Sequence, residues 1–452
     1  MPTQRLRRLG GLERYLATHH FLGLETCIVT SARYTSPENT PLTEAVIFPA
    51  LKALIETHAP LGIRLEGRPD SVDVAFARLA TVDLSRVVEF SETTDLQEAL
   101  EKQLGRPFED TRTDQPLWRV EVLPDNTILF AVHHAIADGL STAAFHRALV
   151  QALQTTSHTP CSPSVLVPNL PLLLAIEDIT NIRLSMSTTL GLIWDALPPK
   201  RWKKAHSAWT GHPVPLRLLL QTRVRLLQFE PSAATKFADT CRAHGATVTS
   251  TLYILAVCTL SRLLLNDTPR NAPVYKTTPV DLPISLRGLT NTPPDVLCNH
   301  VSSCRTFPPL NPEFSWSQAA AFAAELKGVH KKRAREGLGL IRWIAGNLPG
   351  FMMGLLGRKR MYGLIISNLG RVKVQVPELP TDTDTDGGKW ELDEMFFVHS
   401  DTFTGPALGM NIVGDPTGRL NICLRWGEQS VDVAFVEAFI STFRDSFNGL
   451  LA

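Results

Sequence analysis

The sequence predicts a mixed α/β fold built from two lobes, and two observations support this. The chain has 452 residues, more than one hydrophobic core usually holds, and its 44% hydrophobic and 20% charged residues are ordinary for a globular protein. Strand-like and helix-like patterns occur in both halves, around a less periodic stretch at 155–215 that carries many of the prolines. We therefore expect an N-terminal lobe of residues 1–195 and a C-terminal lobe of residues 196–452.

In the first half, the spacing of apolar residues indicates strands and helices in turn. The last two strands are apolar runs separated by a short turn, which predicts a hairpin. The expected elements are, in order, a strand at 26–34, a helix at 43–58, an extended segment at 76–90, a helix at 95–104 and a hairpin of 117–123 with 126–134.

In the second half, long stretches with helical spacing alternate with shorter apolar runs. The final helix has an apolar stripe, which is typical of a face that packs against a core. The expected elements are helices at 233–244 and 249–265, a strand ending near Asp281, a helix at 317–335, a strand at 364–367, a hairpin of 409–413 with 420–424 and a helix at 431–447.

The most informative segment is Asn126-Thr-Ile-Leu-Phe-Ala-Val-His-His-Ala-Ile-Ala-Asp-Gly139. Its apolar run has no polar residue at 128–132, which favours a strand buried on both faces. Because side chains alternate along a strand, His133 and His134 are expected to point in opposite directions. Asp138 precedes a helical pattern, so it is also a candidate N-cap.

A buried, oriented and neutral imidazole can take a proton from a hydroxyl, amine or thiol as that group attacks a thioester. Taken singly, these residues are also compatible with ordinary structural histidines and a simple helix cap. The complete string His-His-x-x-x-Asp-Gly, formed by His133, His134, Asp138 and Gly139, is more specific. It resembles the signature of the superfamily that contains chloramphenicol acetyltransferase, plant BAHD acyltransferases and the condensation domains of peptide synthetases.

Within that superfamily, the chain is most similar to the fungal alcohol acetyltransferase family, nearly from end to end. The similar segments are 9–15, 22–34 and Ser367-Asn-Leu-Gly370, and the Asp-Phe-Gly-Trp-Gly motif of plant members is absent from the sequence. The resemblance implies a two-lobed chloramphenicol-acetyltransferase-like fold, with a tunnel between the lobes and His134 as the base at its midpoint. It also implies an ion pair between Asp138 and Arg287, which would turn the carboxylate away from the base.

Further residues are candidates for the channel or for an oxyanion site. Ser367 and Asn368 end an apolar strand and can donate hydrogen bonds to a developing oxyanion, or can simply form the turn after the strand. Asn299 is a weaker candidate, because Cys298 stands where the family often has glycine.

The resemblance implies an O-acyltransferase that uses acetyl-CoA as co-substrate, holds no permanent cofactor and acts on a small hydroxylated acceptor. Direct transfer is expected, because the sequence has no G-x-S-x-G nucleophile motif. A condensation-like enzyme with a carrier-protein donor and a non-catalytic relative remain alternatives. A metal site of His133, His134 and Asp138 is a further alternative, although diverging histidines disfavour it and we expect no metal.

Composition limits the other classes of function. The net charge of +1 gives no electrostatic case for nucleic acid as a partner. Seven scattered cysteines without a C-x-x-C pair and a start without an apolar leader favour a cytoplasmic protein, expected to be a monomer.

The apolar stretch at 341–357 is interrupted by Arg342, Asn347 and Pro349, so it predicts core or tunnel lining, with peripheral lipid contact as the alternative and no membrane span. The Asp-rich insert at 381–388 is expected to be a surface loop.

Overall fold

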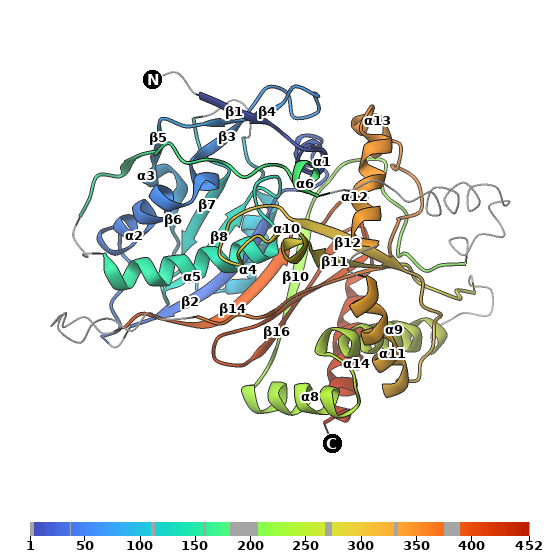
Figure 1. The fold of residues 1–452 in the computed structure, drawn as a ribbon. Helices are drawn as coiled ribbons and strands as arrows, with labels where there is room; N and C mark the ends of the chain where they lie inside the picture. The colour runs from blue at the N-terminus through green and yellow to red at the C-terminus, as the bar shows by residue number, and fades with distance from the viewer. Residues whose placement is uncertain are drawn as a thin grey trace.

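A computed structural model describes residues 4–36, 38–109, 114–156, 160–180, 207–266, 274–329, 333–374 and 389–451. Two large sheets, each covered by helices, form the two lobes (Figure 1). The mixed α/β class is therefore confirmed. The expected lobe boundary at residue 195 and the insert at 381–388 lie outside the described residues, so the extents of the lobes stay a prediction.

The N-terminal lobe is built on a five-stranded sheet with the order β14-β2-β8-β7-β6. Every residue of β8 is buried, as expected from its apolar sequence. Alternate residues of β8 face opposite layers: Phe130 packs with helices α2 and α5, whereas Leu129 packs with α4. The strands are β2 (Ile28–Thr35), β6 (Val88–Phe90), β7 (Trp118–Val122), β8 (Thr127–Val132) and β14 (Glu391–His399), and the helices are α2 (Glu44–Thr57), α4 (Leu96–Gly105) and α5 (Gly139–Thr155).

Smaller elements cover one end of this lobe. A three-stranded sheet has the order β1-β4-β3, and β5 pairs with β9. These elements are β1 (Gln4–Arg8), α1 (Gly11–Phe21), the 3-10 helix η1 (Ala59–Gly62), β3 (Ile63–Glu66), β4 (Ala75–Arg78), β5 (Thr81–Asp83), α3 (Leu84–Val87), β9 (Ser164–Leu166) and α6 (Ile176–Ile179).

The C-terminal lobe has a six-stranded sheet with the order β10-β16-β15-β13-β11-β12. Helices α11 and α14 both pack on α9, and the apolar residues of all three share a second core with the sheet. The strands are β10 (Thr222–Phe229), β11 (Val280–Ser285), β12 (Val301–Thr306), β13 (Leu364–Arg371), β15 (Leu408–Gly414) and β16 (Leu420–Gly427). The helices are α8 (Pro231–Ala243), α9 (Val248–Asn266), α10 (Arg287–Thr290), α11 (Trp316–Val329), α12 (Arg333–Ile344), α13 (Leu348–Met353) and α14 (Val433–Gly449).

Strand β14 connects the two halves of the chain. Although it belongs to the C-terminal half of the sequence, it pairs antiparallel with β2 at the edge of the N-terminal sheet (Figure 1). Its residues Leu392, Met395 and Phe397 are buried in the N-terminal core, and the same strand contacts β15 and β16. The sequence patterns did not predict this strand, which brings a late segment beside the histidine motif.

Several predicted elements have different bounds in the structure. The extended segment at 76–90 is wrong as a single element: Asp83 accepts a hydrogen bond from the Ser85 backbone and caps the short helix α3 between strands. The strand expected to end near Asp281 instead begins beside it, as β11. The helix at 317–335 is divided between α11 and α12, and β12 was not expected.

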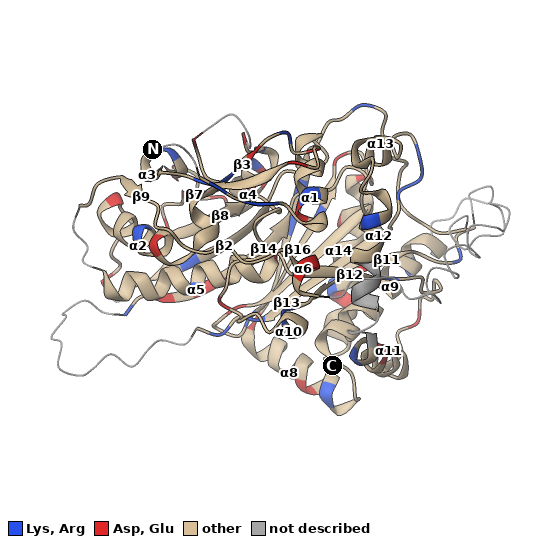
Figure 2. Cartoon of the chain, turned by 45° about the horizontal axis from the view of Figure 1, so that its top comes forward, with Lys and Arg blue, Asp and Glu red and all other residues tan. Residues whose placement is uncertain are grey.

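Among the described residues, one helix, α9, is long and apolar enough to cross a membrane by length and composition. Within its window at 248–265, 61% of the residues are buried inside the structure, where α11 and α14 pack against it. The stretch at 341–357 forms the end of α12, then α13 and a turn; Leu348 and Met352 are buried there, whereas Trp343 is exposed. In the view of Figure 2, basic and acidic residues both occur on both lobes.

Candidate active site

The ends of three neighbouring strands bring the candidate residues together. In the N-terminal sheet, Ile28 of β2 pairs with Val132 of β8 on one side and with His399 of β14 on the other. Glu25 lies just before β2, and His134 follows β8 by two residues. Because neighbouring strands are antiparallel, the start of β2 lies beside the ends of β8 and β14, and Glu25, His134 and His399 lie close together there.

The two motif histidines have different environments, as predicted, although the strand expected to run to His134 ends at Val132 and His134 lies in the turn that follows. His133 is completely buried, its ring centroid is 4.4 Å from that of His20, and its Nδ1 accepts a hydrogen bond from the Ala135 backbone. Burial holds the pKa of His133 well below its usual value, and the nearby His20 and His134 lower it further. His134 is half-buried, so of the two rings it is the one that a substrate can reach.

A backbone carbonyl orients the ring of His134. Its Nδ1 lies 3.1 Å from the carbonyl oxygen of Ala137. Because a carbonyl oxygen can only accept a hydrogen bond, the neutral ring carries its proton on Nδ1 and presents the lone pair of Nε2. This is the tautomer that a general base acting through Nε2 requires.

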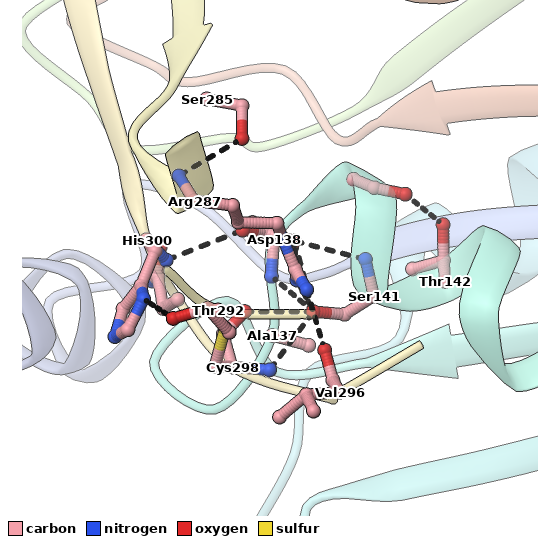
Figure 3. Close-up of polar contacts among 12 residues, drawn as sticks. Ala137, Asp138, Ser141, Thr142, Ser285, Arg287, Thr292, Val296, Cys298 and His300 are labelled. Carbon is pink, nitrogen blue, oxygen red and sulfur yellow. Dashed lines mark hydrogen bonds and ion pairs between the residues drawn. The ribbon is translucent and has the colours of Figure 1, made fainter. Parts of the chain in front are cut away.

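Asp138 caps helix α5 and lies at the centre of a buried network (Figure 3). Its Oδ1 accepts hydrogen bonds from the backbone and hydroxyl of Ser141, both at 2.8 Å, and its Oδ2 accepts from the His300 backbone at 3.2 Å. The Ser141 hydroxyl also accepts a hydrogen bond from the Cys298 backbone N–H at 3.0 Å, which ties the motif to the segment before β12.

The expected contact between Asp138 and Arg287 is present. Nη2 of Arg287 lies 2.8 Å from Oδ1 of Asp138, and both side chains are buried. The other terminal nitrogen of Arg287 donates to the carbonyl oxygens of Pro293 and Val296, which fixes the guanidinium. The Asp138 carboxylate is therefore occupied by Arg287, Ser141 and His300, and the ring of His134 is held by Ala137 instead.

Gly139 allows the first turn of α5 to approach the strands closely. A Cβ atom at this position would lie 2.8 Å from side-chain atoms of both Leu369 on β13 and Phe397 on β14. A side chain at this position would have to displace these two side chains, and the close approach joins the motif to the Ser-Asn-Leu-Gly segment.

The remaining predicted residues have different surroundings. Asn299 donates from its side chain to the carbonyl oxygen of His134 at 2.6 Å, so it contacts the backbone of the candidate base. Asn368 donates to the Thr249 hydroxyl and accepts from the Gly370 backbone, an arrangement typical of a turn. Ser367 is buried on β13, beside Asn411 of β15. An oxyanion or channel role for Ser367, Asn368 and Asn299 stays a prediction.

Sequence reasoning missed Glu25 and His399. One donor atom from each of Glu25, His134 and His399 lies within 4.8 Å of the other two. A signal for His399 exists in the sequence, since an apolar run at 395–398 precedes it much as 128–132 precedes the motif histidines. The acidic Glu25 has no such signal.

Two imidazoles and one carboxylate are also a ligand set that zinc can use. In a tetrahedral zinc site, ligand atoms at about 2.1 Å from the metal are about 3.4 Å apart. The separations of up to 4.8 Å among Glu25, His134 and His399 would have to shorten to reach that geometry. His133 and Asp138, proposed as ligands in the alternative above, do not belong to this cluster.

The chain is similar in sequence to known alcohol acetyltransferases. A sequence model of the alcohol acetyltransferase family matches residues 88–296, which include the histidine motif and Arg287. Residues 88–296 thus resemble an alcohol acetyltransferase domain. It is 22% identical over 472 residues to probable alcohol acetyltransferase FCK4 of Fusarium pseudograminearum, covering 96% of this chain and 92% of that protein. It is 27% identical over 323 residues to probable alcohol acetyltransferase crmB of Aspergillus fumigatus, covering 65% of each.

Solved structures show the same fold at low sequence identity. TRI3 trichothecene 15-O-acetyltransferase from Fusarium sporotrichioides is similar with a TM-score of 0.67 and 12% identity, covering 99% of this chain and 95% of that one. The condensation domain of the Monacolin K polyketide synthase MokA is similar with a TM-score of 0.61 and 12% identity, covering 100% and 97%. The two-lobed chloramphenicol-acetyltransferase-like fold is therefore confirmed, and the protein is an acyltransferase.

Proposed function

We propose that this acyltransferase moves an acetyl or other short acyl group from a coenzyme A thioester to a hydroxyl group of a small, secondary-metabolite acceptor. The names of its relatives support acetyl transfer to an alcohol. The observation that carries the proposal is the ring of His134, which is accessible and locked in the tautomer that presents Nε2 as a base.

In this proposal, Nε2 of His134 takes the hydroxyl proton as the acceptor oxygen attacks the thioester carbonyl. The tetrahedral intermediate then collapses, the carbon–sulfur bond breaks, and the imidazolium returns the proton to the leaving thiolate. Donor and acceptor would enter a channel between the lobes from opposite sides and react in a ternary complex. Asp138 and Arg287 would hold the loop that carries the base without contacting the reacting atoms.

A test of this proposal is incubation of the purified protein with acetyl-CoA and a panel of hydroxylated natural products. We expect release of free coenzyme A thiol and a product heavier by one acetyl group for at least one acceptor. Reactions without an acceptor measure background hydrolysis. If thiol release never exceeds that background for acetyl-CoA and longer acyl-CoA donors, the proposed donor class is wrong.

The shared fold with condensation domains favours a second candidate, in which the acyl group comes from a carrier protein. The donor distinguishes the two functions. Turnover of free coenzyme A thioesters without carrier protein supports the first function. Turnover only with an acylated carrier protein supports the second.

A further inference from the structure

We propose that Glu25 is the counter-ion of the protonated His134 ring, and that it stabilises the charge formed when this ring takes up the proton of the acceptor. The inference rests on the proposed function, because it concerns the same base. It assigns a role to a carboxylate that lies outside the histidine motif.

The first support is the position of Glu25. The residue is 6% exposed and lies in the short connection between α1 and β2. Strand pairing places this connection beside the end of β8 and the end of β14. The Glu25 carboxylate therefore lies within 4.8 Å of a ring nitrogen of His134 and of His399. No Lys or Arg side chain forms an ion pair with Glu25 in the described part of the chain.

The second support is the charge of Glu25. Burial by itself raises the pKa of this carboxyl, but His19, His134 and His399 outweigh it and hold the pKa at about 2. The group is therefore an anion at neutral pH. A buried anion is stable only when a neighbouring group compensates its charge.

The third support is the state of the groups that face this carboxylate. Burial lowers the pKa of His399 well below its usual value, with further lowering by His134 and Arg425 against an opposing effect of Glu25, so burial opposes a charge on His399. Arg425 lies 3.0 Å from Asp401 and is paired there. Burial raises the pKa of Tyr15, so the phenol also stays neutral.

Two imidazoles are then left to carry a compensating charge. Nδ1 of His19 lies 3.6 Å from Oε2 of Glu25, in the range of an ion pair but beyond a hydrogen bond. His19 is buried, whereas His134 is the ring that substrate can reach. The proton that arrives during the reaction therefore adds its charge at His134.

This arrangement has a catalytic consequence. Proton transfer changes His134 from neutral to positive within 4.8 Å of the Glu25 carboxylate. An opposite charge at this separation favours the protonated ring over the neutral ring. Asp138 cannot supply this effect as well, because its oxygens already bind Arg287, Ser141 and His300.

The test compares Glu25→Gln, which removes the charge and keeps the size, with Glu25→Asp, which keeps the charge. We expect Glu25→Gln to lower kcat about 10- to 100-fold, with little change in KM, and to move the acid limb of the pH–rate profile to lower pH. Glu25→Asp should recover part of kcat and leave the limb near its wild-type position. Glu121→Gln is the matched control, since Glu121 is a buried carboxylate on β7 that pairs with Lys102. This control should not move the limb.

Wild-type kcat and pH profile in folded Glu25→Gln would overturn the counter-ion role. If Glu25→Gln does not fold, the test rests on Glu25→Asp alone. A shifted acid limb in the pH–rate profile of Glu25→Asp would then overturn the counter-ion role. Stoichiometric zinc in the purified protein, with activity lost on chelation, would overturn it by making Glu25 a metal ligand. Loss of activity in His134→Ala together with unchanged Glu25→Gln would remove the counter-ion alone, whereas full activity in His134→Ala would remove the proposed function.

Discussion

At the residue scale, the environment of each side chain decides which chemistry it can perform. His133 and His134 are adjacent, yet one is buried against His20 and the other is accessible, because β8 ends at Val132 and His134 already lies in the turn that follows. Asp138 is bound by Arg287, so it supports the loop and does not orient the ring of His134. The sequence resemblance predicted this ion pair correctly.

Because Asp138 and Arg287 form a buried ion pair, we expect substitutions at the two residues to have non-additive effects on the free energy of unfolding. Removing one partner leaves a buried charge uncompensated, so Asp138→Ala and Arg287→Ala should each lower the free energy of unfolding by about 3–5 kcal/mol. The double variant should lose less than the sum, because the second change removes a charge that is already unpaired. Denaturant unfolding of the four proteins measures this, and strict additivity would show that the contact contributes no coupling.

The state of Cys298 leads us to expect direct acetyl transfer, without a covalent intermediate on this thiol. The backbone of Cys298 is hydrogen-bonded to Ser141 beside the motif, and burial, together with the Asp138 charge, raises the pKa of the Cys298 thiol to about 12. A thiol in that state is a poor nucleophile at neutral pH. Intact-mass spectrometry after mixing with acetyl-CoA alone should therefore show no acetyl adduct. An acetylated cysteine that passes its acetyl group to an acceptor would require a ping-pong route instead.

At the element scale, the sequence predicted strands and helices with strong periodicity and missed those whose formation depends on contacts with distant parts of the chain. The hairpin of β7 and β8 and the cap of α5 were predicted, because their signals are local. Strand β14 was not, because its partner β2 is distant in the chain. Glu25 and His399 were missed for the same reason: strand register brings them to His134, and a single sequence does not reveal register.

The close contact of Gly139 on α5 with β13 and β14 leads us to expect that a larger residue at this position disturbs the packing. In Gly139→Ala, the added methyl group would meet Leu369 and Phe397 at 2.8 Å, so these side chains must shift. Overpacking of this kind typically costs about 1–3 kcal/mol, and kcat should fall because α5 follows the loop of the base. Thermal unfolding and steady-state kinetics test this. Wild-type stability and kcat would show that the junction relaxes freely.

At the scale of the whole molecule, buried histidines make stability depend on pH. Burial lowers the pKa of His146 from 6.5 to about 4, where Tyr34 and the Thr30 carbonyl bind its ring. The unfolded chain takes up this proton below about pH 6.5, and the folded protein does so only near pH 4. The stabilisation is therefore complete above pH 6.5 and is lost as the pH falls toward 4.

This linkage predicts a loss of about 3 kcal/mol in the free energy of unfolding from His146 alone between pH 6.5 and 4. Denaturant unfolding at several pH values measures it. His146→Gln should have a shallower pH dependence in this window than the wild type. Equal slopes for the two proteins would contradict the burial of a neutral His146.

The central claim is that His134, and not its neighbour, is the base for acyl transfer. Its most direct test is the steady-state kinetics of His134→Ala, with His133→Ala as the matched control. We expect His134→Ala to fold normally and to lower kcat by roughly two to four orders of magnitude, as for loss of a general base. His133→Ala should lose stability, because its ring is fully buried, and keep most of its catalytic rate. Wild-type activity in folded His134→Ala would contradict the account.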